Sequence, residues 1–215
     1  LGRDIFRRIM HGAILSLSVG FVAVFTAGIA GTLLGLMSGY FGGWTDMIIM
    51  RIMDVMMAFP SMLLAIAIVA VRGNGLFNTI IAISVVGIPG YARLVRSMVL
   101  TLREQDFILA ARMVGVRPPV IILRHILPNS LSPIIVTATM GIGGAILSAA
   151  ALGFLGLGAQ PPAPEWGAMI SDGVPFLRQN PHMVFFPGIA IMLTVLGFNL
   201  LGDGLRDALD PQMRT

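Results

Sequence analysis

The sequence contains no cysteine and no lysine, and only 11% of its residues are charged. Without cysteine it has no disulfide, no thiolate nucleophile and no cysteine-ligated metal site. Soluble domains average about 25% charged residues, so this chain has too little polar surface to cover a water-facing globule. Together with 56% hydrophobic residues and a mean hydropathy of +0.91, the scarcity of charge places the chain in a membrane.

Signatures of catalysis and metal binding are also absent. The chain has neither the G-x-x-x-x-G-K-[ST] phosphate loop nor the H-E-x-x-H zinc motif. His11, His125 and His182 are far apart, and the 15 methionines are typical fillers of irregular gaps between helices rather than a soft-metal path. Asp54 and Asp203 lie near the ends of apolar runs, so a proton relay lacks a buried acid. We predict no catalytic residue, metal site or cofactor in this chain.

Apolar runs dominate what is present. About 20 residues span a hydrocarbon core, and the chain, which we treat as a single membrane domain over residues 1–215, has five such runs. The sequence begins with Leu1, and we expect a sixth helix to precede it. The predicted fold is an all-α membrane protein with crossings at about residues 12–39, 47–71, 76–91, 131–157 and 183–201.

The segments around the first two crossings give further expectations. Leu1 to His11 is charged and amphipathic, which indicates an interfacial helix. The first crossing carries glycines at spacings that let another helix approach closely, namely Gly20, Gly28, Gly31 and Gly35. In the second crossing Arg51 and Asp54 are three residues apart and can pair, either at the membrane edge or as a gate or subunit contact. Pro60 should kink or loosen that helix.

The longest polar interval runs from Arg103 to Pro133. Helical spacing from Glu104 to Val114 places Phe107, Ala110, Ala111 and Val114 on one stripe. Gly115 suits a C-cap, and Pro118 and Pro119 block continuation of that helix. We expect a second short helix from Val120 to Leu127, closed by Pro128. Such a pair is either a lever that a soluble partner holds or an ordinary amphipathic segment resting on the membrane.

Arginine placement gives the orientation. If the polar interval lies on the inner side, nine of the 14 arginines are inside and five are outside, in agreement with the positive-inside rule. The N-terminal group Arg3, Arg7 and Arg8 is the exception. The arginines are scattered among loops, so no compact basic face indicates nucleic acid.

Part of the polar interval resembles the "EAA" loop of ABC importer permeases, whose pattern is E-A-A, three residues, G, nine residues, I-x-L-P. Five positions fit: Ala110, Ala111, Gly115, Leu127 and Pro128. Two depart, because Leu109 replaces the Glu and His125 the Ile. Seven segments resemble the dipeptide/oligopeptide permeases in their "C" subunit: LGRDIF at Leu1, GYFGGWTD at Gly39, IMRIMDVMMAFP at Ile49, YARLVR at Tyr91, RHILPN at Arg124, ALGFLGLGAQPPAPEWG at Ala151 and NLLGDGLRDALDP at Asn199.

The resemblance implies a type I ABC importer transmembrane domain in a bacterial or archaeal cytoplasmic (inner) membrane. Its partners would be a homologous permease subunit, two cytoplasmic ATPase subunits that bind ATP and Mg, and an extracytoplasmic substrate-binding protein. Residues 103–130 would form the cytoplasmic coupling loop, in which Ala110, Ala111 and Gly115 make the close contact with an ATPase. Polar contacts around it are expected from Arg103, Glu104, Asp106 and Arg112.

Other features leave alternatives open. The QPPAPEWG segment, with Glu165 and Trp166, is either a contact for the binding protein or a structural turn that caps the bundle. The Pro-kinked second crossing and the Gly-rich fourth are candidates for lining the pathway. The cargo is a dipeptide or oligopeptide, or alternatively glutathione or chelated nickel. An ATP-independent channel or scaffold is the alternative from another class, and an operon encoding two ATPases, a sister permease and a binding protein would exclude it.

Overall fold

The computed structural model describes residues 4–209, and every regular element within them is helical. The helices are α1 (Ile5–Phe41), α2 (Gly43–Met57), α3 (Ser61–Arg72), α4 (Leu76–Leu102), α5 (Asp106–Met113), α6 (Pro118–Ile121), α7 (Leu127–Phe154), α8 (Trp166–Gly173) and α9 (His182–Leu209). A π-helical turn, Ile122–Ile126, joins α6 to α7, and a 3-10 turn, Val174–Phe176, follows α8.

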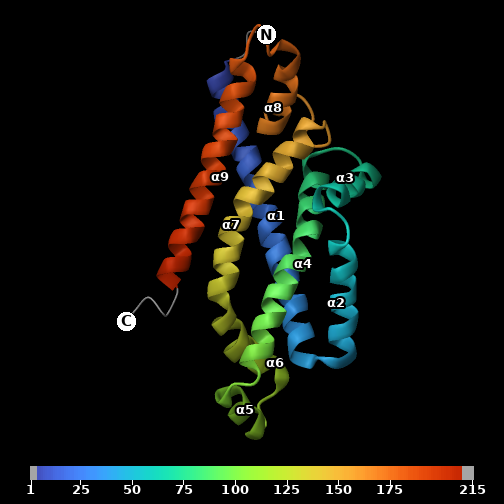
Figure 1. Cartoon of the computed structure of the whole chain (residues 1–215), viewed down its shortest axis with the longest axis vertical. Helices are drawn as coiled ribbons and strands as arrows, with labels where there is room; N and C mark the ends of the chain where they lie inside the picture. The colour runs from blue at the N-terminus through green and yellow to red at the C-terminus, as the bar shows by residue number, and fades with distance from the viewer. Residues whose placement is uncertain (1–3, 210–215) are drawn as a thin grey trace.

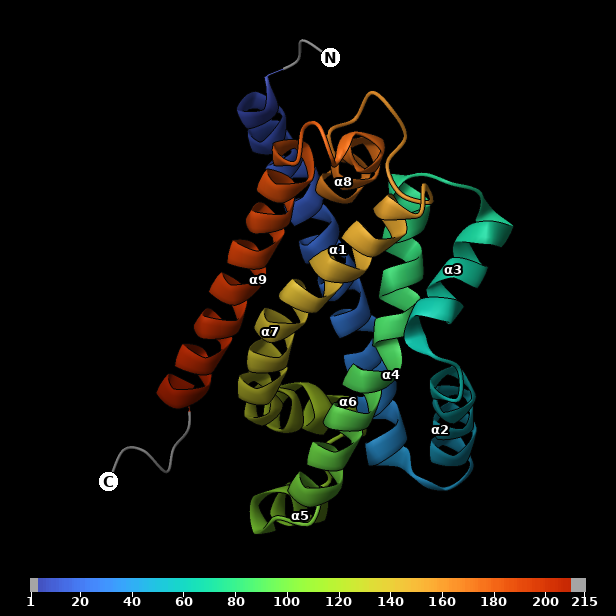
Figure 2. The same cartoon turned by 45° about the horizontal axis from the view of Figure 1, so that its top comes forward.

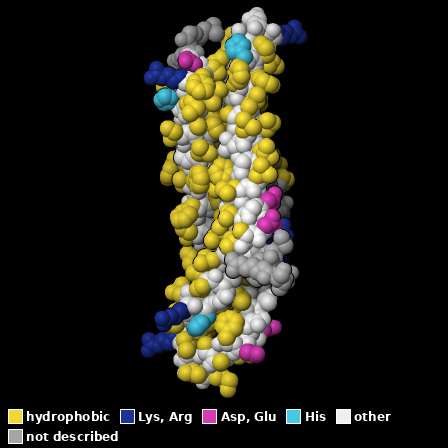
Figure 3. All heavy atoms as spheres, turned by 90° about the vertical axis from the view of Figure 1, so that its left-hand side faces the viewer, with side chains coloured by type: hydrophobic (Ala, Val, Ile, Leu, Met, Phe, Trp, Pro, Cys, Tyr) yellow, Lys and Arg dark blue, Asp and Glu magenta, His cyan; other side chains and the backbone are white. Residues whose placement is uncertain are grey.

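The long helices α1, α4, α7 and α9 run along the length of the molecule (Figures 1 and 2). The helix α8 lies at the end that holds the start of α1, and α5 lies at the opposite end (Figure 1); we call these the α8 end and the α5 end. Four described spans are long and apolar enough to cross a membrane: α1, α4, Pro118–Phe154 and α9. Hydrophobic side chains cover most of the long face in Figure 3, as a lipid-facing surface requires. Charged side chains gather near its two ends, and acidic ones also lie at its right-hand edge about half-way along.

The second predicted crossing is broken rather than kinked. The helices α2 and α3 meet at a bend of 94° around Pro60, and they count as one span only if the bent pair is taken together. Proline cannot donate a backbone hydrogen bond and clashes with the preceding turn, which explains the break.

Two other helices extend beyond the expected crossings. The amphipathic segment up to His11, predicted to be an interfacial helix, is helical from Ile5 and continues without a break into the rest of α1. Asp4 caps it by accepting the N–H of Arg7 at 3.3 Å, and Leu1 to Arg3 lie outside the described residues. The helix α4 continues past Tyr91 to Leu102, with Pro89 buried inside it.

The α1–α4 contact depends on glycine, as the sequence predicted. A Cβ atom at Gly31 would lie 2.5 Å from the Cβ of Tyr91, and one at Gly35 would lie 2.6 Å from the carbonyl oxygen of Ala92. These distances are shorter than any real contact, so only glycine lets the two backbones approach this closely. Van der Waals packing of this kind is what joins helices in lipid.

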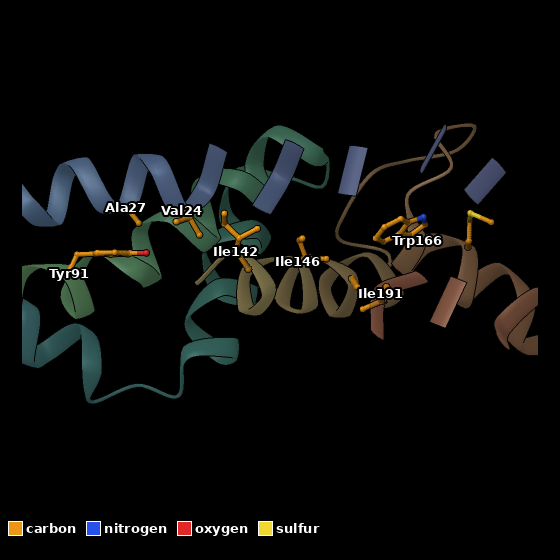
Figure 4. Close-up of a cluster of buried hydrophobic side chains, with 10 residues drawn as sticks. Val24, Ala27, Tyr91, Ile142, Ile146, Trp166 and Ile191 are labelled. Atoms are coloured by element: carbon orange, nitrogen blue, oxygen red, sulfur yellow. The ribbon is translucent and has the colours of Figure 1, made fainter. Parts of the chain in front are cut away.

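Buried side chains form separate clusters along the bundle. The first cluster joins α1, α4, α7, α8 and α9 (Figure 4), and its labelled members are Val24, Ala27, Tyr91, Ile142, Ile146, Trp166 and Ile191. The second cluster lies at the α5 end and contains Leu36, Val95, Val99, Ile108, Ile121 and Ile126. The loop of residues 103–130 is therefore packed onto the ends of α1 and α4 by this second cluster.

The glycine contact gives a direct test of the fold. Gly35→Ala should destabilise the protein by about 1–3 kcal/mol, because the new methyl group has no space against Ala92. Gly28→Ala is the matched control, since its Cβ would meet only Tyr91 at 3.9 Å. Thermal midpoints in detergent measure both changes, and equal midpoints for the two variants would contradict the packing described here.

Candidate functional site

The helix α5 is short, and its ends carry the features that stabilise it. Asp106 lies in the first turn and Arg112 in the last, where each complements the helix dipole. Gly115 has φ +82°, a conformation that favours glycine. Around it the N–H of Gly115 donates to the carbonyl of Arg112 and the N–H of Val116 donates to that of Ala111, both at 3.0 Å. This is the Schellman arrangement that ends helices at glycine, and it occurs at the glycine that the sequence indicated.

The apolar face of α5 is divided between the protein and the solvent. Ile108 is fully buried in the second cluster, and Ala111 packs against that cluster. Ala110 and Gly115 are exposed, so only two of the three small residues expected at a partner contact face outward. The most exposed apolar side chains of the loop are Met113 at 89% and Val114 at 84%. Sequence reasoning missed Met113, although it directly precedes the C-cap.

Two of the polar residues expected to meet a partner hold the loop to α1 instead. Arg103 donates from Nη1 to the carbonyl of Gly39 at 3.1 Å. The guanidinium of Arg112 lies 5.0 Å from the centre of the Tyr40 ring, within range of a cation–π attraction. Glu104 and Asp106 are exposed. Arg112 thus holds α5 against the last turn of α1, and Arg103 ties the end of α4 to the same turn. The acidic side chains remain on the surface.

The second short helix does not end at Pro128, and that prediction is wrong. The chain passes from α6 through the π-helical turn directly into α7, so that Pro118–Phe154 forms one span. Pro128 is tolerated because it lies in the first turn of α7, after the wider π turn. Asn129 and Ser130 donate from their side chains to the carbonyls of His125 and Ile126 in that turn. Leu127 packs on the second cluster, and Pro128 is exposed.

Ion pairs join α2 to α4 close to the loop. Asp46 accepts two hydrogen bonds from Arg96, at 2.5 and 2.6 Å, and one from Ser38. Asp54 pairs with Arg93 at 2.6 Å. The expected pair of Arg51 and Asp54 is therefore wrong, because the carboxylate of Asp54 turns toward the neighbouring helix rather than along its own.

At the opposite end Glu165 and Trp166 are almost fully buried, with 2% and 3% exposure. Glu165 caps α8 by accepting the N–H groups of Gly167 and Ala168, both at 2.9 Å, and it accepts a hydrogen bond from Ser16 at 3.5 Å. The indole of Trp166 donates to the carbonyl of Ile9 at 3.1 Å. These contacts favour the structural reading of the segment, because neither side chain is free to meet a soluble partner in this arrangement.

Burial raises the pKa of the Glu165 carboxyl above its ordinary value, and the N–H groups of Gly167 and Ala168 and the Ser16 hydroxyl oppose the shift only in part. A raised folded-state pKa gives stability that is fully present below the unfolded pKa and is lost as the pH rises through the folded pKa. The thermal midpoint of the wild type, relative to that of the non-titrating Glu165→Gln, should therefore decrease as the pH rises above the ordinary pKa of a glutamate carboxyl and through its raised folded-state pKa.

The measurement is a series of thermal midpoints in detergent at stepped pH. Glu104→Gln, which alters an exposed carboxylate, is the matched control. A difference between wild type and Glu165→Gln that stays constant with pH would contradict the assignment.

Comparison with known proteins identifies the chain. A family model described as "Binding-protein-dependent transport system inner membrane component" matches residues 31–215. The dipeptide transport system permease protein DppC of Alkalihalophilus pseudofirmus is 63% identical over 100% of this chain and 70% of its own length. The glutathione transport system permease protein GsiD of Pectobacterium atrosepticum is 53% identical over 100% of this chain and 71% of its own length.

Solved structures show the same fold. A chain of the MetNI methionine ABC transporter in inward-facing conformations is 20% identical, with a TM-score of 0.75, and the match covers 98% of this chain and 100% of that one. A chain of an amino acid ABC transporter gives a TM-score of 0.70 at 15% identity, over 97% of this chain and 100% of that one. On the family match and on relatives that are 63% and 53% identical over 100% of this chain, the chain belongs to the binding-protein-dependent transport system inner membrane components, the permease subunits of ABC importers.

Proposed function

We propose that this permease is driven by ATPase subunits that hold the exposed side of α5. The division of α5 into a buried and an exposed side is the observation that supports the proposal. Ile108 is buried and holds the helix against the protein, while Met113 and Val114 at its C-terminal end are exposed. Exposed apolar side chains beside charged ones are typical of a surface that meets another protein. The helix α5 lies at the extreme end of the molecule (Figure 1), which leaves room for a large soluble subunit beyond the membrane.

The same geometry explains how force would reach the membrane. A partner that moves α5 also moves the ends of α1 and α4, because the second cluster and the Arg103 and Arg112 contacts join them. The short helix and the two crossings then act as one rigid body, which is the usual way that closure of one domain is passed to another. This chain lacks a phosphate loop, so ATP and Mg would be bound by the two ATPase subunits.

Two further partners are proposed. A homologous permease subunit would complete the pathway, and a substrate-binding protein would deliver cargo at the α8 end. The loop before α8 offers exposed residues there, Gln160, Pro161 and Pro162. We place the binding-protein contact on that loop rather than on the buried Glu165 and Trp166.

The cargo proposed is a dipeptide or a short oligopeptide. The relatives named for dipeptide and glutathione transport are 63% and 53% identical to this chain, and both names point to small peptides. Chelated nickel is the remaining alternative in the same machinery. Identifying the ligand that the purified partner binding protein retains decides among them; a nickel chelate in place of a peptide would overturn the proposed cargo.

Replacement of Gly115 tests the coupling role. Gly115→Val should uncouple ATP hydrolysis from uptake, because a β-branched residue cannot adopt φ +82° without strain and the end of α5 would shift. Gly115→Asn is the matched control, since Asn tolerates this conformation. Uptake and ATPase rates in vesicles that contain the whole complex measure the effect, and unchanged coupling in the Val variant would show that the loop is not the docking element.

Met113 tests the exposed surface separately from the backbone. Met113→Asp should lower ATPase association and uptake by at least tenfold, because a charge would be buried in the contact without a partner. The side chain is 89% exposed in this subunit, so the fold itself should be unaffected. Met113→Leu keeps an apolar side chain and should retain most activity. Co-purification of the ATPase with each variant gives the readout, and undiminished co-purification of the Asp variant would contradict the docking proposal.

A further inference from the structure

A cavity of about 190 Å³ lies between α1, α4 and α7. Two polar side chains reach it, those of Tyr91 and Ser148, and Ser148 donates to the carbonyl of Gly144 in its own helix at 2.9 Å. A Cβ atom at Gly141 would lie 3.0 Å from the hydroxyl oxygen of Tyr91, so the glycine leaves that oxygen uncovered. Much of the remaining wall consists of the small residues Ala23, Ala27, Gly87 and Ala145.

The cavity lies near the middle of the membrane-spanning part of the molecule. In α1 its lining residues fall within 23–27 of the uncharged run 12–41, and in α7 they fall within 141–148 of the run 127–154. In α4 residues 83, 86 and 87 of the run 76–92 line it, together with Tyr91. The three helices therefore agree in placing the cavity close to the centre of a bilayer, where backbone and side chains meet water only along a water-filled cavity.

Tyr91 carries a hydroxyl group into this cavity. Its Cβ atom lies against Gly31 and its ring atom Cε1 against Gly28, so the ring points back along α4 toward the bilayer centre, beside Ala27 (Figure 4). Tyr91 is 6% exposed, and its hydroxyl forms no hydrogen bond with any residue from 4 to 209. No side-chain oxygen in that range is both closed off from solvent and unpaired, so the hydroxyl opens onto the cavity. An unpaired hydroxyl is costly at this depth, and it therefore requires a polar partner that enters the cavity.

The exposed side of α4 next to the cavity carries small and polar residues. Beyond the cavity its exposed residues are Gly90, Arg93, Ser97 and Thr101. Their spacing of three or four residues places them in one stripe, and Ile83 and Gly87 of the cavity continue it. Arg93 and Asp54 remain 44% and 52% exposed in their ion pair. Charged groups in membrane proteins face water or the protein interior rather than lipid, so this stripe faces water.

The neighbouring helix α1 shows a lipid-facing side at the same level. Gly31 and Gly35 of α1 lie against Tyr91 and Ala92 of α4, so the two helices are side by side here. From Gly31 to the end of α1 the exposed residues are Leu33, Met37 and Phe41, and all of them are large and apolar. At one depth, then, α1 faces lipid and α4 faces water, and the water-facing stripe leads from the α5 end to the cavity.

We propose that the cavity between α1, α4 and α7 is a contact site for the peptide cargo, and that the hydroxyl of Tyr91 forms a hydrogen bond with a peptide bond of that cargo. This inference rests on the proposed function, because it takes the cargo to be a small peptide. A phenolic hydroxyl both donates and accepts, so it matches the C=O and N–H groups of a peptide bond. The small residues Ala27, Gly87 and Ala145 leave space for a short cargo side chain, and the stripe on α4 is the route on toward the α5 end.

Thiol labelling tests the proposal, since the chain contains no cysteine of its own. Ser148→Cys, in the cavity, and the matched Leu147→Cys, which is 56% exposed on another side of α7, are each assembled into the complete transporter in lipid nanodiscs. A charged, water-soluble maleimide is added with ATP and with the binding protein empty, loaded with dialanine or loaded with glutathione. The mass shift of this subunit gives the rate. Ser148→Cys should react roughly tenfold faster than Leu147→Cys, because only a thiolate attacks the reagent, and one loaded binding protein should slow its labelling severalfold.

Three results would overturn the proposal. Equal, slow labelling of both variants would place the cavity away from water. Absent labelling together with cross-linking of Ser148→Cys to the sister permease would make the cavity part of a subunit interface. Rapid labelling that neither peptide slows would make it a water-filled crevice without cargo.

Removal of the hydroxyl tests Tyr91 itself. Tyr91→Phe should raise the KM for peptide uptake severalfold without lowering the thermal midpoint in detergent, because the hydroxyl has no partner among residues 4–209 that the change would remove. Gly141→Ala, whose methyl group would lie against the hydroxyl oxygen, should raise KM by a similar factor, and the double variant should be no worse than either single one. A lower midpoint for Tyr91→Phe with an unchanged KM would make the hydroxyl a structural group and contradict the proposal.

The ATP requirement separates this inference from the proposed function. If wild-type uptake did not require ATP but Ser148→Cys were still protected by peptide, the ATP-driven function would fail and the cargo site would stand. If uptake required ATP and Tyr91→Phe left KM unchanged, the cargo site would fail and the function would stand.

Discussion

The close approach of α1 to α4 is the contact on which the rest of the structure depends. At Gly31 and Gly35 there is no space for even a methyl group, so the two backbones are held at a single separation over several turns. In lipid, where apolar burial between helices gives little net driving force, this complementarity is the main source of association. The last turns of both helices pack against residues 103–130, and their separation therefore fixes the surface on which α5 sits.

Contacts with the ends of α1 and α4 join the short helix α5 to the membrane-spanning helices. Ile108 is buried in the same cluster as Leu36 of α1 and Val95 of α4, and Arg112 covers the ring of Tyr40. An isolated helix of eight residues would not be stable in water, so α5 depends on this support for its existence as well as its position. At the other end, Glu165 and Trp166 join α8 to α1. The helix α1 thus connects the two ends of the molecule.

Much of this arrangement could be predicted from the sequence. Long uncharged runs predicted a membrane protein. The glycine spacing in α1 predicted a close contact with another helix, and Gly115 predicted where α5 ends. Contacts between distant residues could not be predicted. The residues next to Asp54 in the sequence do not show that it pairs with Arg93 rather than with Arg51. The residues next to Arg103 and Arg112 likewise do not show that these arginines contact α1. The continuation through Pro128 was missed because a π turn, unlike an α-helical turn, leaves no clear sequence signal.

If ATPase subunits drive this permease as proposed, α5 and the α1–α4 pair should move as one body when the ATPases close. Spin labels at Phe41→Cys, the last residue of α1, and at Phe107→Cys, on α5, measure this motion most directly. Both positions are exposed, neither is Met113 of the proposed contact, and the chain has no other cysteine. The distance between the labels should be the same in the resting complex and in the complex trapped with ATP and vanadate. A change of about one helical turn, roughly 5 Å, would show that α5 moves separately and would contradict the rigid-body motion.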